Sequence, residues 1–210
     1  MSTATVMASS FFKSIFPESD WTEITTIDCD QVCQKLASAG TLNAAAAAYM
    51  KAARIRLGFH QQYKSGAGWT VIRNITLAPG AKLDDPYTLC LISHEIFHLQ
   101  QSIWTRLSVQ GELRAWQYQK QAYHELTGKE IGDHGEAFGG TKTYWDQLAL
   151  LSIDSREDLL VAQGLMKDLC RDYRSDCLPL FPLNKEIREF LKQGKIVEAI
   201  RTVWNLITCR

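Results

Sequence analysis

The stretch that decides the fold is DPYTLCLISHEIFHLQQ, which runs from Asp85 to Gln101. Asp85 is a good N-cap and Pro86 suits the first position of a helix, so we predict a helix from residue 86 to about 105. Most of its side chains are apolar.

Strands are predicted before this helix. Apolar residues alternate over 55–59 and, with a break at residues 72 and 73, over 69–77, and this alternation is typical of half-buried strands. We expect the two runs to form an antiparallel pair. Helices are predicted further upstream, over 28–39 and 41–53. Residues 1–20, rich in Ser, Thr and Ala, are expected to form a flexible tail.

The chain after the helix is predicted to be almost entirely helical. N-caps, glycines and prolines divide it into helices over 109–127, 133–151, 155–173 and 184–207, the last with an expected break at Gly194. A length of 210 residues suits one domain, which we place at 21–210. The predicted class is α+β: a small antiparallel sheet, the central helix, and a mainly helical C-terminal half.

Composition excludes several classes of protein. The chain has 23 Lys and Arg and 23 Asp and Glu, so it lacks the basic surplus of a nucleic-acid-binding protein. It has no apolar run long enough to span a membrane, and its N-terminus lacks the pattern of a signal peptide. The six cysteines are therefore expected to be free thiols in a cytoplasmic protein, with a Cys170–Cys177 disulfide as the alternative for an exported one.

The central helix contains the motif HExxH, formed by His94, Glu95 and His98. Histidines four residues apart share one face of a helix, so both imidazoles can bind one metal ion. Glu95 lies about 100° around the helix from His94, where it can reach a water beside the metal. This composition predicts about 0.006 chance occurrences of the motif, so an accidental match is a poor explanation. The motif predicts a zinc site, and two histidines with a carboxylate also suit iron(II).

A catalytic zinc usually has three protein ligands and one open position. Glu112 is the best candidate for the third ligand, because a helix, a turn and a returning helix of similar length bring it back beside the histidines. The small residues Gly111 and Ala115 would let the two helices approach closely. Four other residues remain as alternatives: His124, Glu125, His134 and Glu136.

The segment from Pro86 to Gln119 resembles the zincin-like metallopeptidases, in particular the gluzincin pattern of HExxH followed by a downstream Glu. Only 13 residues separate His98 from Glu112, fewer than in thermolysin-like members, which suggests a compact zincin built on a direct helical hairpin. The resemblance implies that His94, His98 and Glu112 bind Zn²⁺. It also implies that the strand at 69–77 lies at the sheet edge over the cleft, where it would pair with substrate.

By this resemblance the protein would hydrolyse peptide bonds in a peptide or protein substrate. Glu95 would act as general base, taking a proton from the water that zinc activates. The alternative is a non-catalytic zincin-like module that binds a metal or a protein partner. Several side chains are available as donors to the tetrahedral oxyanion, and spacing singles out none of them: Tyr123, His124, His134 and Tyr144.

Three other features have ordinary structural interpretations. Cys90, one turn before His94, is expected to be a small buried residue of the core. Of Gln100 and Gln101, one is expected to face the site and the other the solvent. Three of the tryptophans in the helical half are expected to be core aromatics: Trp104, Trp116 and Trp145.

Overall fold

The computed structural model describes residues 24–60, 67–69, 74–106, 108–132, 142–170 and 183–200. The strands are β1 (Ile24–Thr26), β2 (Arg56–His60), β3 (Ala67–Trp69) and β4 (Asn74–Leu77). The helices are α2 (Cys29–Ala39), α3 (Thr41–Ala52), α4 (Pro86–Gln100), α5 (Ile103–Arg106), α6 (Val109–Thr127), α7 (Lys142–Leu150), α8 (Arg156–Cys170) and α9 (Leu183–Lys192). The chain therefore combines a small sheet with a mainly helical remainder, as predicted, while the tail at 1–20 lies outside the described residues.

The sheet differs from the prediction. Its strand order is β1-β2-β4-β3, with β1 antiparallel to β2 and β3 antiparallel to β4. The central pair, β2 and β4, is parallel, with Leu57 opposite Ile75. The expected antiparallel pairing of 55–59 with 69–77 is therefore wrong. The second run contains the end of β3 and all of β4, and these two strands are antiparallel to each other. β4 therefore runs in the same direction as β2.

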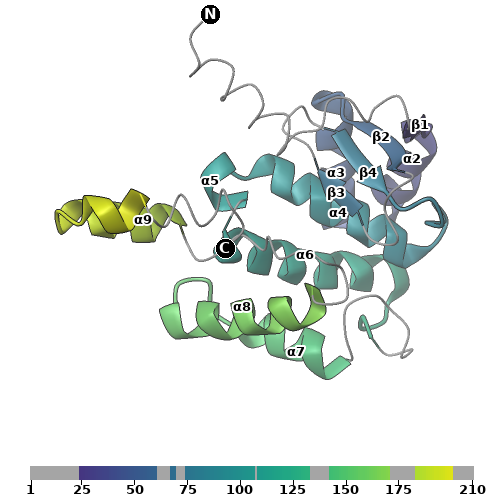
Figure 1. Cartoon of the computed structure of the whole chain (residues 1–210). Coiled ribbons are helices and arrows are strands. Elements are labelled where there is room, and N and C mark those ends of the chain that lie inside the picture. Colours follow the sequence, from purple (N-terminus) through teal and green to yellow (C-terminus); the bar gives the residue numbers. More distant parts are fainter. Residues whose placement is uncertain are drawn as a thin grey trace, which may run out of the picture.

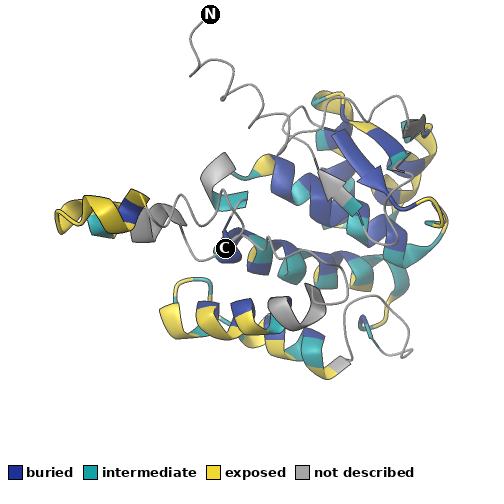
Figure 2. Cartoon of the chain, viewed as in Figure 1, coloured by how far each residue is buried: buried dark blue, intermediate teal, exposed yellow. Residues whose placement is uncertain are grey.

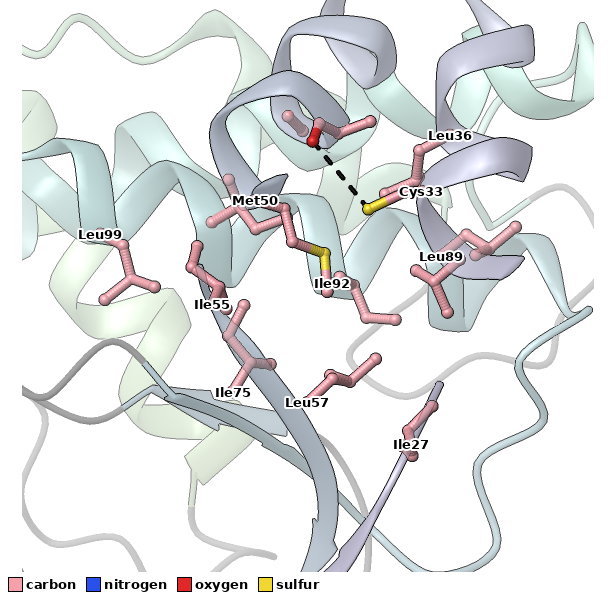
Figure 3. Packing of buried hydrophobic residues seen from close by; sticks show 14 of the residues in the cluster. Ile27, Cys33, Leu36, Met50, Ile55, Leu57, Ile75, Leu89, Ile92 and Leu99 are labelled. Carbon is pink, nitrogen blue, oxygen red and sulfur yellow. Dashed lines mark hydrogen bonds between the residues drawn. The ribbon is translucent and has the colours of Figure 1, made fainter. Parts of the chain in front are cut away.

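The main core lies between the sheet and helices α2, α3 and α4 (Figure 3). Leu57 and Ile75, from the parallel pair, are fully buried and meet Met50 of α3 and Ile92 of α4. Side chains of this size each stabilise the fold by about 1.5–3 kcal/mol when they leave water. Because α4 supplies four members of this cluster (Leu89, Ile92, Ile96 and Leu99), its position against the sheet is tightly determined.

The helices continue the layers on the other side of α4 (Figure 1). Helix α6 packs along α4, and α7 and α8 pack against α6. Dark blue in Figure 2 marks α4 as the most continuously buried helix, whereas α9 projects from the body and its residues 188–192 are mostly exposed. Helix α4 is therefore buried between the sheet and α6, and its polar residues meet side chains from α6.

Helix α4 ends earlier than predicted. It stops at Gln100, and residues 103–106 form the separate short helix α5. The early end is explained by Arg106, whose guanidinium donates hydrogen bonds to the carbonyls of Leu99 at 3.0 Å and Gln101 at 2.8 Å. The carbonyls at a helix end need such partners. The chain can therefore turn sooner and return along α4 as α6.

A buried polar network joins helices α3, α4 and α6. Ser93 of α4 donates a hydrogen bond to the Asn43 amide oxygen at 3.0 Å. The Asn43 amide donates in turn to the Ala122 carbonyl and to Glu125 on α6, at 2.9 and 3.0 Å. Because buried polar groups that are fully paired favour one arrangement of their elements, this network fixes α3, α4 and α6 relative to one another.

The remaining helical predictions hold where they can be compared. Helix α8 begins after Ser155, whose hydroxyl accepts from the backbone of Asp158 at 3.1 Å. The helix predicted over 133–151 is described from 142, as α7, and its expected start lies outside the described residues. The expected break at Gly194 is present, with a left-handed φ of 71°.

Candidate metal centre

His94 and His98 face each other from successive turns of α4. Their Nε2 atoms are 3.1 Å apart, and the two residues are only 4% and 2% exposed. An α-helix places residues i and i+4 on one face, so this proximity follows directly from the spacing. The two histidines lie on one face as predicted, each with a ring nitrogen directed at the same point.

Glu112 enters from α6. Its Oε2 lies 3.0 Å from His98 Nε2 and its Oε1 lies 3.5 Å from His94 Nε2. One donor atom from each of the three residues can be chosen so that all lie within 4.8 Å of one another. The helical hairpin predicted from the short spacing therefore brings Glu112 to the histidines, and these three residues form the candidate metal centre.

The close approach of the two helices depends on Gly111. A Cβ at this position would lie 1.9 Å from the Thr105 carbonyl oxygen and 2.9 Å from the Gln101 side chain. Ser108 caps the helix here, because its hydroxyl accepts from the Gly111 backbone at 3.1 Å and donates to Thr105 at 2.6 Å. Only glycine fits this space, so the residue before Glu112 determines how near Glu112 comes to α4.

Two further side chains contact the ligand residues, a role that was not predicted from the sequence. Gln101 contacts His98 Nδ1 through its Oε1 at 3.1 Å. The Trp116 indole donates to Glu112 Oε1 at 2.7 Å, and its ring stands edge-on to His94 with centroids 6.1 Å apart. Each lies three or four residues from the ligand it contacts, which is the spacing of neighbours on a helix. That spacing was the available signal.

Glu95 is 5% exposed and sits on α4 next to His94. Burial raises the pKa of Glu95 above its ordinary value. The charges of His94 and His98 lower this pKa, whereas the Glu112 carboxylate raises it further, and the net pKa is raised. A carboxylate with a raised pKa is a stronger base than an ordinary one, so Glu95 is suited to accept a proton.

The ligands interact strongly with each other. Burial alone would lower the pKa of His98, but the nearby Glu112 carboxylate outweighs it and the pKa is raised. Burial alone would raise the pKa of Glu112, but His98 and His94 hold it well below its ordinary value. The Glu112 carboxyl group is therefore ionised at neutral pH, as a carboxylate ligand must be.

The alternative third ligands do not join this centre where they are described. Glu125 accepts from the backbone N–H groups of Leu42 and Asn43, each at 3.0 Å, and so caps α3, whose own N-cap is a glycine. His124 is 57% exposed and lies 3.5 Å from Glu130. The other two alternatives, His134 and Glu136, lie outside the described residues.

The other residues singled out from the sequence have the following positions. Cys90 is fully buried in a cluster with Trp145, and burial raises the pKa of its thiol, so its expected place in the core is confirmed. Gln100 is exposed and Gln101 half-buried, as expected for one solvent-facing and one site-facing residue. Tyr144 packs edge-on against Trp116, with centroids 5.8 Å apart. The side chain of Trp104 lies outside the description, as do those of Cys170 and Cys177.

An open cavity of about 760 Å³ lies along a different face of α6 and is separate from this centre. Its polar groups already pair with each other. Lys120 lies 2.6 Å from Asp146 and 3.2 Å from Glu130, and Gln117 donates to two backbone carbonyls at and just after the end of α7. These pairs engage several of the polar groups around the cavity, whereas the grouped donors that could hold a metal ion, among the described residues, are His94, His98 and Glu112.

Comparison with known proteins adds no identification. No family model, no curated protein and no solved structure matches the chain. Among the described helices, none combines the length and the apolar character that crossing a bilayer requires.

Proposed function

We propose that this protein is a zinc-dependent metallopeptidase of the zincin type, with His94, His98 and Glu112 as metal ligands. The observation that carries the proposal is the convergence of these three donors from two helices, with Glu95 beside them. Two imidazoles and one carboxylate are a frequent ligand set of catalytic zinc. Nε2 of His94 faces the other two ligands. Its buried Nδ1 has no partner among the described residues.

The number of ligands favours catalysis over a purely structural site. Structural zinc normally has four protein ligands, whereas catalytic zinc has three and leaves one position for water or substrate. The described residues offer three grouped donors. This count argues for a peptidase over the alternative, a non-catalytic zincin-like module that binds a metal or a protein.

In this proposal each residue has one task. When bound, zinc would supply Lewis acidity, polarising the substrate carbonyl and making a water molecule more acidic. Glu95 accepts the proton of the attacking water and delivers it to the leaving amine. Trp116 and Gln101 keep Glu112 and His98 in place during this exchange.

The edge of the sheet offers a place for the substrate backbone. The expectation that the whole run 69–77 fills this role needs correction, because β4 is paired on both sides and has no free edge. β3, by contrast, ends the four-stranded sheet and lies against α4. We assign substrate pairing to the backbone of residues 67–69, since an extended peptide can add to an open strand edge.

The metal is tested first. Mass spectrometry of the purified full-length protein should find about one zinc per chain, and the zinc should be lost in His94→Ala and Glu112→Ala. His124→Ala is the matched control, because His124 is an exposed histidine outside the centre. A protein that binds no zinc even when zinc is offered would end the proposal.

The reaction is tested second. A peptide library incubated with the zinc-loaded protein should reveal cleavage, which Glu95→Gln should abolish without loss of zinc. Glutamine keeps the size of Glu95 and cannot accept the proton. If Glu95→Gln cleaved as fast as the natural protein, the assignment of the base would be wrong. Zinc binding with no cleavage of any peptide would favour the non-catalytic module.

A further inference from the structure

Gln101 makes two hydrogen bonds that join the ligand-bearing helices. Its Oε1 lies 3.1 Å from Nδ1 of His98, the second histidine of α4. Its Nε2 donates to the backbone carbonyl of Gly111 at 3.0 Å, and Gly111 is the residue directly before Glu112. One half-buried side chain therefore contacts a ligand on α4 and the backbone beside a ligand on α6.

These two bonds determine the protonation of His98. The Gly111 carbonyl can only accept, so the NH₂ group of Gln101 must face it, and the amide oxygen must face His98. An amide oxygen also only accepts, so Nδ1 of His98 must carry a hydrogen. In the neutral imidazole the other nitrogen, Nε2, is then unprotonated and directed at Glu112 and His94, which is the form that binds a metal.

Among the described residues, the two histidines differ in the hydrogen bonding of their Nδ1 atoms. Nδ1 of His94 is buried and has no partner among the described residues. The absence of a side chain at Gly111 is also part of the arrangement, because a Cβ there would lie 2.9 Å from Oε1 of Gln101.

We propose that Gln101 is a positioning residue of the metal centre. Its amide oxygen holds His98 in the tautomer and orientation that bind metal, while its NH₂ group holds α6 at the distance that Glu112 requires. The inference rests on the proposed function, because it takes His94, His98 and Glu112 to be metal ligands. Partners of this kind typically change metal affinity about 10- to 100-fold.

The test separates the two hydrogen bonds. Full-length protein is stripped of metal, and its zinc affinity is measured by competition with a chromophoric chelator. Thermal unfolding of the metal-free protein is measured in parallel. Gln101→Met removes both bonds, whereas Gln101→Glu keeps an oxygen to accept from His98 and removes the donor to Gly111. Gln100→Met is the matched control, because Gln100 is the neighbouring exposed glutamine.

We expect Gln101→Met to bind zinc about 10- to 100-fold more weakly, and Gln101→Glu to recover part of that loss, because it restores the acceptor for His98 but not the donor to Gly111. Both variants should lower the unfolding temperature of the metal-free protein, and Gln100→Met should match the natural protein in both measurements. A merely structural role would weaken zinc binding equally in both Gln101 variants, and that result would overturn the inference. It would also be overturned if Gln101→Met bound zinc as tightly as Gln100→Met. A natural protein that bound no zinc would instead overturn the proposed function, and the inference with it.

Discussion

Replacing Gly111 by alanine should separate the two helices that hold the metal ligands. The added Cβ would lie 1.9 Å from the Thr105 carbonyl oxygen, whereas real Cβ atoms essentially never come closer than 3.0 Å to another heavy atom. Helix α6 must therefore retreat from Thr105 of α5 by at least about 1.1 Å. The Thr105 oxygen cannot move aside easily, because it accepts hydrogen bonds from both the hydroxyl and the backbone N–H of Ser108.

The size of the effect follows from a matched substitution elsewhere in the chain. Gly164 also lies inside a helix, α8, and a Cβ there would meet no atom within 4 Å. Replacing a helical glycine by alanine in open space stabilises a protein by about 0.5–1 kcal/mol. This gain is common to both variants, so the difference between them isolates the packing strain at Gly111, which we expect to be about 1–3 kcal/mol.

Two measurements test this reasoning. In thermal unfolding, Gly111→Ala should melt below Gly164→Ala by about 2–4 °C for each kcal/mol of strain. Its zinc affinity should also fall by at least about 10-fold, because metal–ligand distances vary by only about 0.2 Å. If Gly111→Ala were as stable as Gly164→Ala and bound zinc like the natural protein, the close approach at Gly111 would not position Glu112.

Three further predictions concern single contacts. Trp116→Phe keeps an aromatic ring but removes the donor to Glu112, so zinc affinity should fall about 10-fold. Trp145→Phe should leave it unchanged in the same chelator titration, since its buried indole N–H has no partner among the described residues. Because the Glu112 carboxylate raises the pKa of His98 above 6.5, protons compete for this ligand. Zinc affinity should therefore already weaken on lowering the pH from 8 to 6, and a flat profile would contradict this. Removing the Glu125 carboxylate with alanine should cost about 1–3 kcal/mol in urea unfolding, because two backbone N–H groups of α3 lose their acceptor. Zinc stoichiometry should be unaffected, and unchanged stability would refute this capping role.

Much of the candidate centre could be predicted from the sequence. His94 and His98 had to meet because helical geometry acts over a single turn, and Asp85 with Pro86 marked the start of that helix. Glu112 required one more assumption, a tight hairpin, for which Gly111 was the signal. The error about where α4 ends came from Arg106, since its hydrogen bonds to the carbonyls of the helix end are not visible in a pattern of apolar residues.

The sequence by itself determined the elements whose causes are local. These are the capped helix α4, the facing pair His94 and His98, and a mainly helical second half. Only the tertiary structure decided the parallel pairing of β2 with β4, because strand direction depends on how the intervening chain folds back. It likewise decided that Glu125 caps α3 across 83 residues of chain, and that the Gln101 amide bridges His98 and Gly111. Each of these contacts joins separate elements of the fold. The local interactions within one helix or strand therefore do not determine which of these contacts forms.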